Sequence, residues 1–401
     1  MSTQSDIPLH YVILGAGAAG TLLALELSKI TSPSFRITLI DNKDFHEFTP
    51  SIINVLLQPT TAELRSRLNS ICPLLAEMFK DTRVEVIKGV IKSVTTEEVI
   101  LQDTKVPYTH LAICTGSSYS APYKLSLDIE TVEQRYDDLL ESRNAIESTE
   151  SILCIGGGPV GVEMVGELAA RYPEKSITLV HSKPELLEKI PGNLGADAKA
   201  SFEEEYAHKA VVKVILDEKA LPSSNGDGSY VTSKTNQELH PGHVIFSRGI
   251  APNSEFMTAN FPDCLDDQKY IRVDEFFQVL DQTNIYAIGD VSNNPDPKLF
   301  FTAHMQAMHL CKNINAQLSG KQPAPYKGSR ISYAVSLGPE VGLLSFSDGI
   351  LTIRGVRRML FKKARRGSRL AMFSKHMIEK VSLTGLPASA MNNILYYTTT
   401  K

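Results

Sequence analysis

Two stretches of the chain repeat one pattern of apolar and amphipathic segments. In the first, an apolar run at residues 11–14 precedes a glycine-rich turn, a helix predicted over 18–29 and a second apolar run at 36–41. The second stretch repeats this order with apolar runs at 151–155 and 176–180. Short apolar runs that alternate with helices are typical of parallel strands joined by crossover helices. The pattern therefore predicts two α/β units with doubly wound parallel sheets.

The two units divide the chain into three predicted parts. With 401 residues, the chain is too long for one compact core. We expect a discontinuous first domain at 1–120 and 264–325, with a strand that ends in Gly-Asp at 284–290, and a second domain inserted at 121–263. Short strands, a basic segment and a polar tail predict a small α+β module at 326–401. The fold class is thus α/β, with two Rossmann-like dinucleotide-binding domains and this module.

The first glycine-rich turn has the spacing of a dinucleotide-binding site. Gly15 allows the tight turn, Gly17 leaves room for a pyrophosphate, and Gly20 lets the helix pack on the strand. Asp41 ends the next strand, where a carboxylate can accept the hydroxyls of an adenosine ribose. The expected binding residues of the turn are Gly15, Gly17, Ala18, Ala19 and Gly20.

A second turn with the same spacing precedes the helix predicted over 159–171. At the matching strand end the chain has His181, Ser182 and Lys183 instead of a carboxylate. Such groups suit a phosphate, so we expect NADPH not to be excluded and the donor to be NADH, NADPH or both. The alternative is that these residues are solvated and the ribose is bound elsewhere. The expected binding residues are Gly156, Gly158, Pro159, Val160, Gly161 and His181.

Three further segments resemble motifs of the two-domain pyridine-nucleotide flavoproteins. Residues 113–116 are similar to the turn that closes the first domain of that family, and residues 249–253 to the turn that closes its nicotinamide domain. Residues 287–290 resemble the motif whose Asp contacts the ribityl chain and pyrophosphate of the flavin. The resemblance covers residues 11–316 and implies non-covalent FAD in the first domain and NAD(P)H in the second. It adds Thr115, Gly116, Gly249, Pro252, Gly289 and Asp290 to the expected binding residues.

Within that family the chain most resembles the apoptosis-inducing-factor-like branch of NAD(P)H:quinone oxidoreductases, which includes the ferroptosis-suppressor group and is related to type II NADH dehydrogenases. The similar segments are residues 41–46, 161–164, 172–175, 177–182 and 335–339. The resemblance implies hydride transfer from NAD(P)H to the flavin, and electron transfer from there to a quinone or a similar small acceptor. Two departures are the missing myristoylation glycine and the segment at 298–308, which differs from the usual flavin-side sequence.

The resemblance also suggests roles for two charged residues. Glu163 would orient the ribose or carboxamide of the nicotinamide nucleotide, and the alternative is an exposed carboxylate in the first turn of a helix. For Lys43 two roles stay open: a contact with the flavin, and an ordinary surface charge.

The cysteines bear on the electron acceptor. The five cysteines are scattered, and residues 45–50 lack the CxxxxC pair of the disulfide reductases of this superfamily, so electrons would leave to an external acceptor. A metal site is not expected. Two other functions stay open. One is a ferredoxin or rubredoxin reductase, and the other is a redox-sensing signalling flavoprotein with slow turnover.

Charge and the chain ends limit partners and location. The net charge of −4 does not favour nucleic acid. The chain has no predicted signal peptide, presequence or transmembrane run, and residue 2 is Ser, so a cytoplasmic protein is expected. A homodimer stays open.

One segment near the C-terminus is strongly basic, although the chain as a whole has a net charge of −4. Between Arg354 and Arg369 lie eight Lys or Arg residues and no Asp or Glu. Ile353, Val356, Leu360 and Ala364 recur at helical spacing, which predicts a basic amphipathic helix over 353–369 that contacts an anionic membrane surface. The alternatives are a stripe packed on the first domain or a docking site for an acidic partner.

Overall fold

The computed structural model describes residues 9–30, 35–190, 194–205, 211–328, 333–338, 341–346 and 351–357. Its first sheet has the strand order β17-β7-β1-β2-β3, with all pairs parallel. The strands are β1 (Leu9–Leu14), β2 (Phe35–Asp41), β3 (Val84–Lys88), β7 (His110–Ile113) and β17 (Ile285–Ala287). Strand β17 follows the inserted second unit in sequence, so the first sheet is built from both sides of the insertion.

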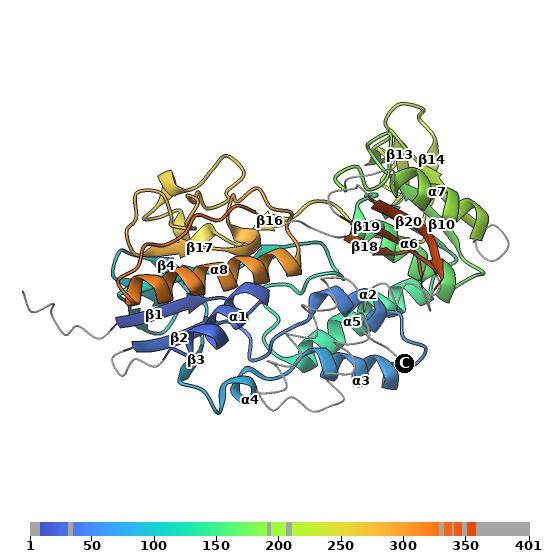
Figure 1. Cartoon of the computed structure of the whole chain (residues 1–401). Coiled ribbons are helices and arrows are strands. Elements are labelled where there is room, and N and C mark those ends of the chain that lie inside the picture. The colour runs from blue at the N-terminus through green and yellow to red at the C-terminus, as the bar shows by residue number, and fades with distance from the viewer. Residues whose placement is uncertain are drawn as a thin grey trace, which may run out of the picture.

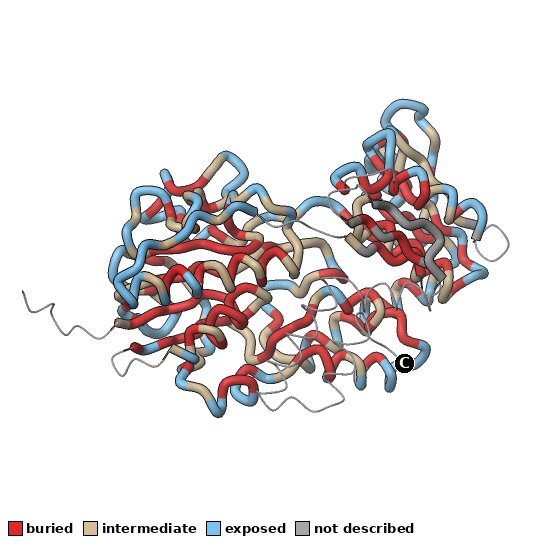
Figure 2. Tube along the Cα trace, in the orientation of Figure 1, coloured by how far each residue is buried: buried red, intermediate tan, exposed pale blue. Residues whose placement is uncertain are grey.

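Other elements cover both faces of this sheet (Figure 1), and the residues between them and the sheet are mostly apolar. On one face lie α1 (Ala18–Leu27), α4 (Leu75–Phe79) and α8 (Phe300–Leu318), and α1 packs on α8. The other face meets a meander of β4 (Ile91–Val94), β5 (Glu98–Leu101) and β6 (Lys105–Pro107), with the short helices η2 (Glu255–Met257) and η3 (Pro262–Cys264). Strands β1, β2, β7 and β17 are therefore buried along most of their length, as Figure 2 shows, whereas the edge strand β3 exposes Glu85 and Lys88.

The second sheet repeats the topology of the first. Its order is β11-β10-β9-β15, again all parallel. The strands are β9 (Ser151–Ile155), β10 (Ser176–Val180), β11 (Val211–Ile215) and β15 (His243–Phe246), with helices α6 (Pro159–Arg171) and α7 (Leu194–Glu205). A three-stranded sheet of β12 (Ala220–Pro222), β13 (Tyr230–Thr232) and β14 (Glu238–Leu239) is attached to it. In both main sheets the second and third strands lie on one side of the first and the fourth on the other, which is the order of dinucleotide-binding folds.

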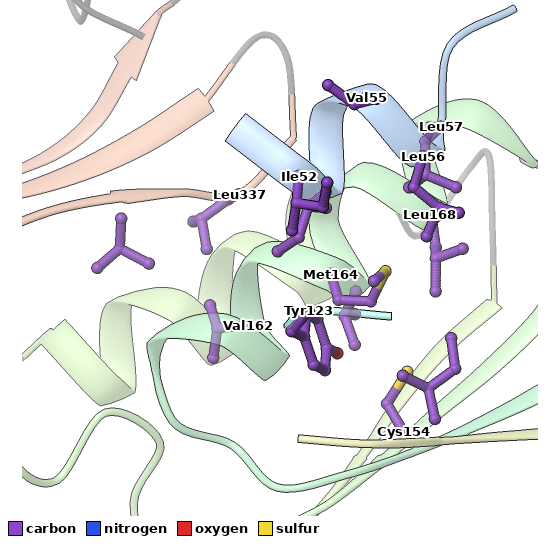
Figure 3. Packing of buried hydrophobic residues seen from close by; sticks show 14 of the residues in the cluster. Ile52, Val55, Leu56, Leu57, Tyr123, Cys154, Val162, Met164, Leu168 and Leu337 are labelled. Carbon is purple, nitrogen blue, oxygen red and sulfur yellow. The ribbon is translucent and has the colours of Figure 1, made fainter. Parts of the chain in front are cut away.

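A layer of short helices joins the two sheets. It consists of η1 (Thr49–Ser51), α2 (Ile52–Leu56), α3 (Thr61–Ile71) and α5 (Val132–Glu147). Helix α5 begins with a capping box, in which Thr131 and Gln134 exchange hydrogen bonds between side chain and backbone. Figure 3 shows Ile52 and Leu56 of α2 in the same apolar cluster as Met164 and Leu168 of α6. The layer and the second unit thus share one core, whereas the first sheet packs in two separate apolar clusters.

Two tight turns also bind the units together. Strand β8 (Ser117–Ser118), just after the first sheet, pairs antiparallel with β16 (Ala251–Pro252), just after the second. Of the two segments predicted to close the domains, 113–116 ends directly before β8, and 249–253 contains β16. The pairing of β8 with β16 holds the two segments that connect the units side by side.

A third sheet packs on the second unit. Its strands are β18 (Tyr333–Ser336), β19 (Val341–Phe346) and β20 (Leu351–Arg357), in antiparallel order. They contact α6 and α7. A Cβ on Gly166 of α6 would lie 2.3 Å from the backbone carbon of Leu337, so only glycine permits this close approach.

The structure agrees with the predicted repeat and corrects one element. The predicted strand runs and crossover helices are present, with β9, β10 and α6 at the predicted bounds. The helix predicted over 353–369 is wrong in its first part, because residues 351–357 pair with β19 as a strand. Gly355 and the β-branched residues around it disfavour a helix there. Residues 358–369 lie outside the described residues. The predicted domain bounds remain predictions.

In the part of the chain that the structure describes, no helix is long and apolar enough to cross a membrane.

The buried guanidinium of Arg135 should be essential to the helical layer. Arg135 is fully buried, and its Nε lies 2.8 Å from Oε2 of buried Glu47. It also contacts Asp138 and donates to the Pro122 carbonyl. Arg135→Ala leaves Glu47 as an uncompensated buried charge, and we expect a loss of about 3–5 kcal/mol in unfolding free energy. Chemical denaturation measures this.

Two variants control this prediction. Arg65→Ala removes the exposed ion pair with Glu133 and should leave the denaturation midpoint almost unchanged. Arg135→Met with Glu47→Met should recover much of the lost stability, since no buried charge then remains. Equal effects of Arg135→Ala and Arg65→Ala would contradict this account.

Candidate functional site

The first glycine motif forms the turn between β1 and α1, at the carboxyl edge of the first sheet. Gly15 has φ +95°, and a Cβ on it would lie 2.5 Å from the Cys114 carbonyl oxygen. A Cβ on Gly20 would lie 1.8 Å from the Gly15 oxygen, so the helix packs on the turn as expected. A Cβ on Gly17 would meet nothing within 4 Å. Gly17 therefore faces open space at the N-terminus of α1, where phosphate oxygens can meet backbone N–H groups.

The second motif repeats this geometry between β9 and α6. Gly156 has φ +119°, and its Cβ would lie 2.2 Å from the Ser247 oxygen. A Cβ on Gly161 would lie 1.9 Å from the Gly156 oxygen, whereas one on Gly158 would meet nothing within 4 Å. Pro159 is at the first helical position, and Val160 packs against the shared core. The chain thus contains two cradles that fit the pyrophosphate of a dinucleotide.

Asp41 lies at the end of β2, beside the first cradle. Its Oδ2 accepts a hydrogen bond from the Ala16 amide at 2.5 Å and lies 2.8 Å from Lys43 Nζ. The carboxylate is thus held next to the motif, as ribose binding requires. Lys43 pairs with Asp41 and is only about one-tenth exposed, which argues against an ordinary surface charge. Its contact with the flavin stays a prediction.

Asp290 reaches the same edge from the turn after β17. Its Oδ2 accepts from Ser117 Oγ at 2.7 Å and from Lys124 Nζ at 2.8 Å. Burial favours a higher pKa for Asp290, but the attraction of Lys124 and the hydrogen bonds outweigh it and hold the pKa below its usual range. Asp290 is therefore ionised at neutral pH, and its carboxylate can accept a hydroxyl of a bound ligand.

Gly289 brings this turn against two helices. It has φ +78°, and a Cβ on it would lie 3.4 Å from Ala19 of α1 and 3.7 Å from Ala303 of α8. Its amide donates to Gln306 Oε1 at 2.7 Å. Thus Ala19, the Gly-Asp turn and the start of α8 (Phe300–Leu318) meet at one edge.

The turns after β7 and β15 meet between the two units. Thr115 Oγ1 donates to the Asn253 carbonyl at 2.7 Å, and the Asn253 side chain donates to the Thr115 carbonyl at 3.0 Å. The Asn253 amide also donates to the Gly116 carbonyl at 3.0 Å. Pro252 belongs to the paired β16, whereas Gly249 is exposed and a Cβ on it would meet nothing within 4 Å. These residues connect the two candidate sites.

A buried aromatic cluster lies between the first motif and α8. The Phe300 ring packs edge-to-face on Phe48 at 4.8 Å and on His304 at 4.4 Å, between ring centroids. His46 Nδ1 lies 3.0 Å from the Ala16 carbonyl oxygen. Burial lowers the pKa of His46 to about 4 and that of His304 to about 3. Burial therefore favours the neutral form of both imidazoles at pH 7, which argues against an imidazolium acid here.

The second unit contains an acid that sequence reasoning missed. His181 follows β10, and its Nδ1 accepts a hydrogen bond from the Gly157 amide at 3.1 Å. Its Nε2 lies 3.0 Å from Oε2 of Glu188. The end of β10 therefore has no carboxylate in its own sequence, but the folded chain places that of Glu188 beside it. Glu188 comes seven residues later in a charged loop, and no motif marks it.

Glu163 is positioned by the third sheet. It lies in the first turns of α6, and its Oε1 accepts a hydrogen bond from the Ser336 amide at 3.1 Å. Leu337 follows Ser336 and packs against α6 at Gly166. The contact argues against the alternative that Glu163 is an unattached surface carboxylate. Sequence reasoning did not find Ser336 as its partner, nor Lys124 as the partner of Asp290, because each pair is more than 150 residues apart.

The Lys124–Asp290 pair gives a pH-dependent prediction. Because the folded-state pKa of Asp290 is depressed, the pair contributes fully above about pH 4, the unfolded value, and less as the pH falls further. Lys124→Met should therefore lower stability at pH 7, by about 1.5–3 kcal/mol for a lost hydrogen bond to a charged group. Thermal unfolding from pH 3 to pH 8 should show the two proteins converging at acid pH.

The double variant Lys124→Met with Asp290→Asn is the matched control. It removes the buried charge and should flatten the difference with pH. A constant difference at every pH would show that Lys124 acts through packing alone.

Comparisons with known proteins agree with this geometry. Human ferroptosis suppressor protein 1 is 28% identical over 360 residues, which cover 86% of this chain and 91% of that protein. Apoptosis-inducing factor homolog A of Dictyostelium discoideum is 27% identical over 363 residues, which cover 84% and 85%. The sulfide:quinone oxidoreductase of Aquifex aeolicus shares the fold, with a TM-score of 0.71, 19% identity and coverage of 96% and 94%. These similarities support the expected branch.

A family model described as pyridine nucleotide-disulphide oxidoreductase matches residues 9–307, from β1 through the first turns of α8. The match includes both glycine cradles, the paired turns and Asp290. It also accounts for the expected use of FAD and a nicotinamide nucleotide in one chain. The chain belongs to the pyridine nucleotide-disulphide oxidoreductase family.

Proposed function

We propose that the chain transfers electrons from NAD(P)H through FAD to a quinone. The observation that carries this proposal is the pair of superposable cradles, in which Gly17 and Gly158 both face open space. Two dinucleotide cradles in one chain suit a tightly held redox group and a diffusing donor. When bound, FAD supplies the two-electron chemistry that links hydride removal from NAD(P)H to reduction of the acceptor.

The first cradle is the proposed flavin site. The α1 N-terminus and Gly17 would hold the pyrophosphate, and Asp41 the adenosine ribose. Asp290, ionised and fixed by Lys124, would accept hydroxyls of the ribityl chain. The N-terminus of α8 begins beside the Gly-Asp turn, and its positive end would stabilise negative charge on the flavin ring.

The second cradle is the proposed nicotinamide-nucleotide site. Gly158 and the α6 N-terminus would hold its pyrophosphate. Glu163, held by the Ser336 amide, would orient the nicotinamide ribose or carboxamide. The paired turns at Thr115 and Asn253 join the two sites and would keep donor and flavin aligned for hydride transfer.

Three observations support a small apolar acceptor. All five cysteines are free, and four are buried, so an internal dithiol relay has no support. The neutral His46 and His304 and the rings of Phe48 and Phe300 make the region beside the first cradle apolar. The Aquifex protein of the same fold is a sulfide:quinone oxidoreductase. A flat, apolar quinone suits such surroundings better than a hydrophilic acceptor does.

A peripheral contact with an anionic membrane is part of the proposal on sequence grounds only. The cations concerned fall mostly in residues 358–369, outside the described part of the chain. Their charge would favour anionic headgroups by about 1 kcal/mol per residue near the surface. Such contact would bring the enzyme to quinones dissolved in the bilayer. A cytoplasmic location and a homodimer remain further parts of the proposal.

A matched pair of glycine variants tests the assignment of the two cradles. Gly17→Leu should yield folded but colourless protein, because the side chain fills the space for the flavin pyrophosphate. Gly158→Leu should keep the flavin spectrum and lose reduction by NADH and NADPH. Absorbance spectra measure both, with circular dichroism as the check on folding. A yellow Gly17→Leu protein would refute the assignment of FAD to the first cradle. A colourless Gly158→Leu protein would show that FAD binds at the second cradle.

Steady-state kinetics test the acceptor. We expect NAD(P)H oxidation with short-chain ubiquinone or menadione at about 10 s⁻¹ or faster, the ordinary enzymatic range. Ferredoxin, compared in the same assay, should be reduced much more slowly. Faster turnover with ferredoxin would favour a ferredoxin-type reductase. A single slow reduction without turnover would favour a redox sensor.

A further inference from the structure

We infer that Glu188, through its contact with His181, makes the second cradle favour NADH over NADPH. The inference rests on the proposed function, because it takes the second cradle as the nicotinamide-nucleotide site. It reverses the expectation from the sequence that NADPH is not excluded, which rested on the lack of an acid at residues 181–183.

His181 stands in the second unit where Asp41 stands in the first. Asp41 accepts a hydrogen bond from Ala16, the residue between the first two motif glycines. His181 accepts one from Gly157, the residue at the same place in the second motif. This position at the end of the second strand faces the adenosine ribose in dinucleotide-binding folds. His181 is therefore placed to meet the part of the nucleotide where NADH and NADPH differ.

The hydrogen bonds fix the protonation of the His181 ring. Because Nδ1 accepts from the Gly157 amide, it carries no proton, and the ring proton is on Nε2. Nε2 then donates to Glu188 Oε2 at 3.0 Å. The ring is held at both nitrogens and has no donor left for a phosphate. The Glu188 side chain is 30% exposed, so its negative charge is accessible from solvent beside the ribose position.

The backbone before Glu188 is strained in a way that favours this contact. Leu187 has φ +56°, a left-handed conformation that is unfavourable for a residue with a branched side chain. Its amide donates to the Gly157 carbonyl at 2.9 Å, and its side chain is buried. Leu186 packs on Gly157, where an added Cβ would lie 2.4 Å from a Leu186 methyl carbon. The loop is thus attached to the cradle itself, and Glu188 follows directly.

The charge of Glu188 accounts for the discrimination. A 2′-phosphate at this strand end would face the carboxylate, and like charges repel more strongly where water is partly excluded. The 2′-hydroxyl of NADH carries no charge and meets no such repulsion. Lys183 is exposed at the start of the loop and stays available to a phosphate once the acid is gone. Glu188 is therefore a specificity-determining residue.

The test compares binding of AMP and adenosine 2′,5′-bisphosphate to the FAD-loaded enzyme by calorimetry. Glu188→Gln keeps an acceptor for His181 and removes the charge. It should tighten the bisphosphate by about tenfold, as expected for removing one like charge, and leave AMP within about twofold. The kcat/KM ratio of NADPH to NADH should rise by a similar factor. Glu185→Gln, an exposed charge removed from the same loop, is the control and should change neither ligand.

The outcomes separate this inference from the proposed function. If wild-type enzyme binds AMP but Glu188→Gln has the same ratio of bisphosphate affinity to AMP affinity as wild type, the inference alone is overturned. Equal changes for both ligands show a structural role and also overturn it. Wild-type enzyme that binds neither nucleotide overturns the assignment of the cradle, and the inference with it. If Glu188→Gln is unstable, Glu188→Ala in the same assay decides, since it also removes the negative charge.

Discussion

The contact between the first and third glycines of each motif is the constraint on which both sites depend. In each unit the helix approaches the turn so closely that a Cβ on Gly20 or Gly161 would overlap a backbone oxygen. This closeness sets the helix N-terminus at the carboxyl edge of its sheet. It also leaves one amide of the turn facing the second strand, where Asp41 in one unit and His181 in the other accept it. The same backbone arrangement is thus used twice, with different polar groups.

The link between the units depends on contacts of another kind. Thr115 and Asn253 exchange hydrogen bonds through the paired turns, and buried Arg135 connects α5 to Glu47 and to the Pro122 carbonyl. Arg135 and Glu47 are buried, and Thr115 and Asn253 are half-buried. Polar groups withdrawn from water in this way require well-placed partners, so these contacts specify the relative position of the two units. Apolar packing between α2 and α6 adds buried area but is not directional. Alignment of the two cradles therefore depends mainly on these few polar contacts.

Sequence reasoning succeeded where the pattern is local. Apolar runs, glycine spacing and the strand-ending Asp41 predicted the two sheets and the cradles, because turn geometry and helix packing act over a few residues. It failed for Lys124 and Ser336, whose partners Asp290 and Glu163 are distant in sequence. It also failed at residues 351–357, where helical spacing of apolar residues hid a strand that pairing with β19 stabilises. Glu188 was missed because a single acid in a charged loop has no periodicity to detect.

The close packing of Leu337 against Gly166 separates two properties of the molecule. The third sheet supports α6 and Glu163, whereas the first sheet and its Gly-Asp turn are assembled from strands that end before it begins. A chain that stops before β18 would retain every strand of the first sheet and lose the group that steadies Glu163. On the proposed function, such a chain would keep the flavin site and lose the support of Glu163, so a yellow preparation alone would not show that the nicotinamide-nucleotide site is intact.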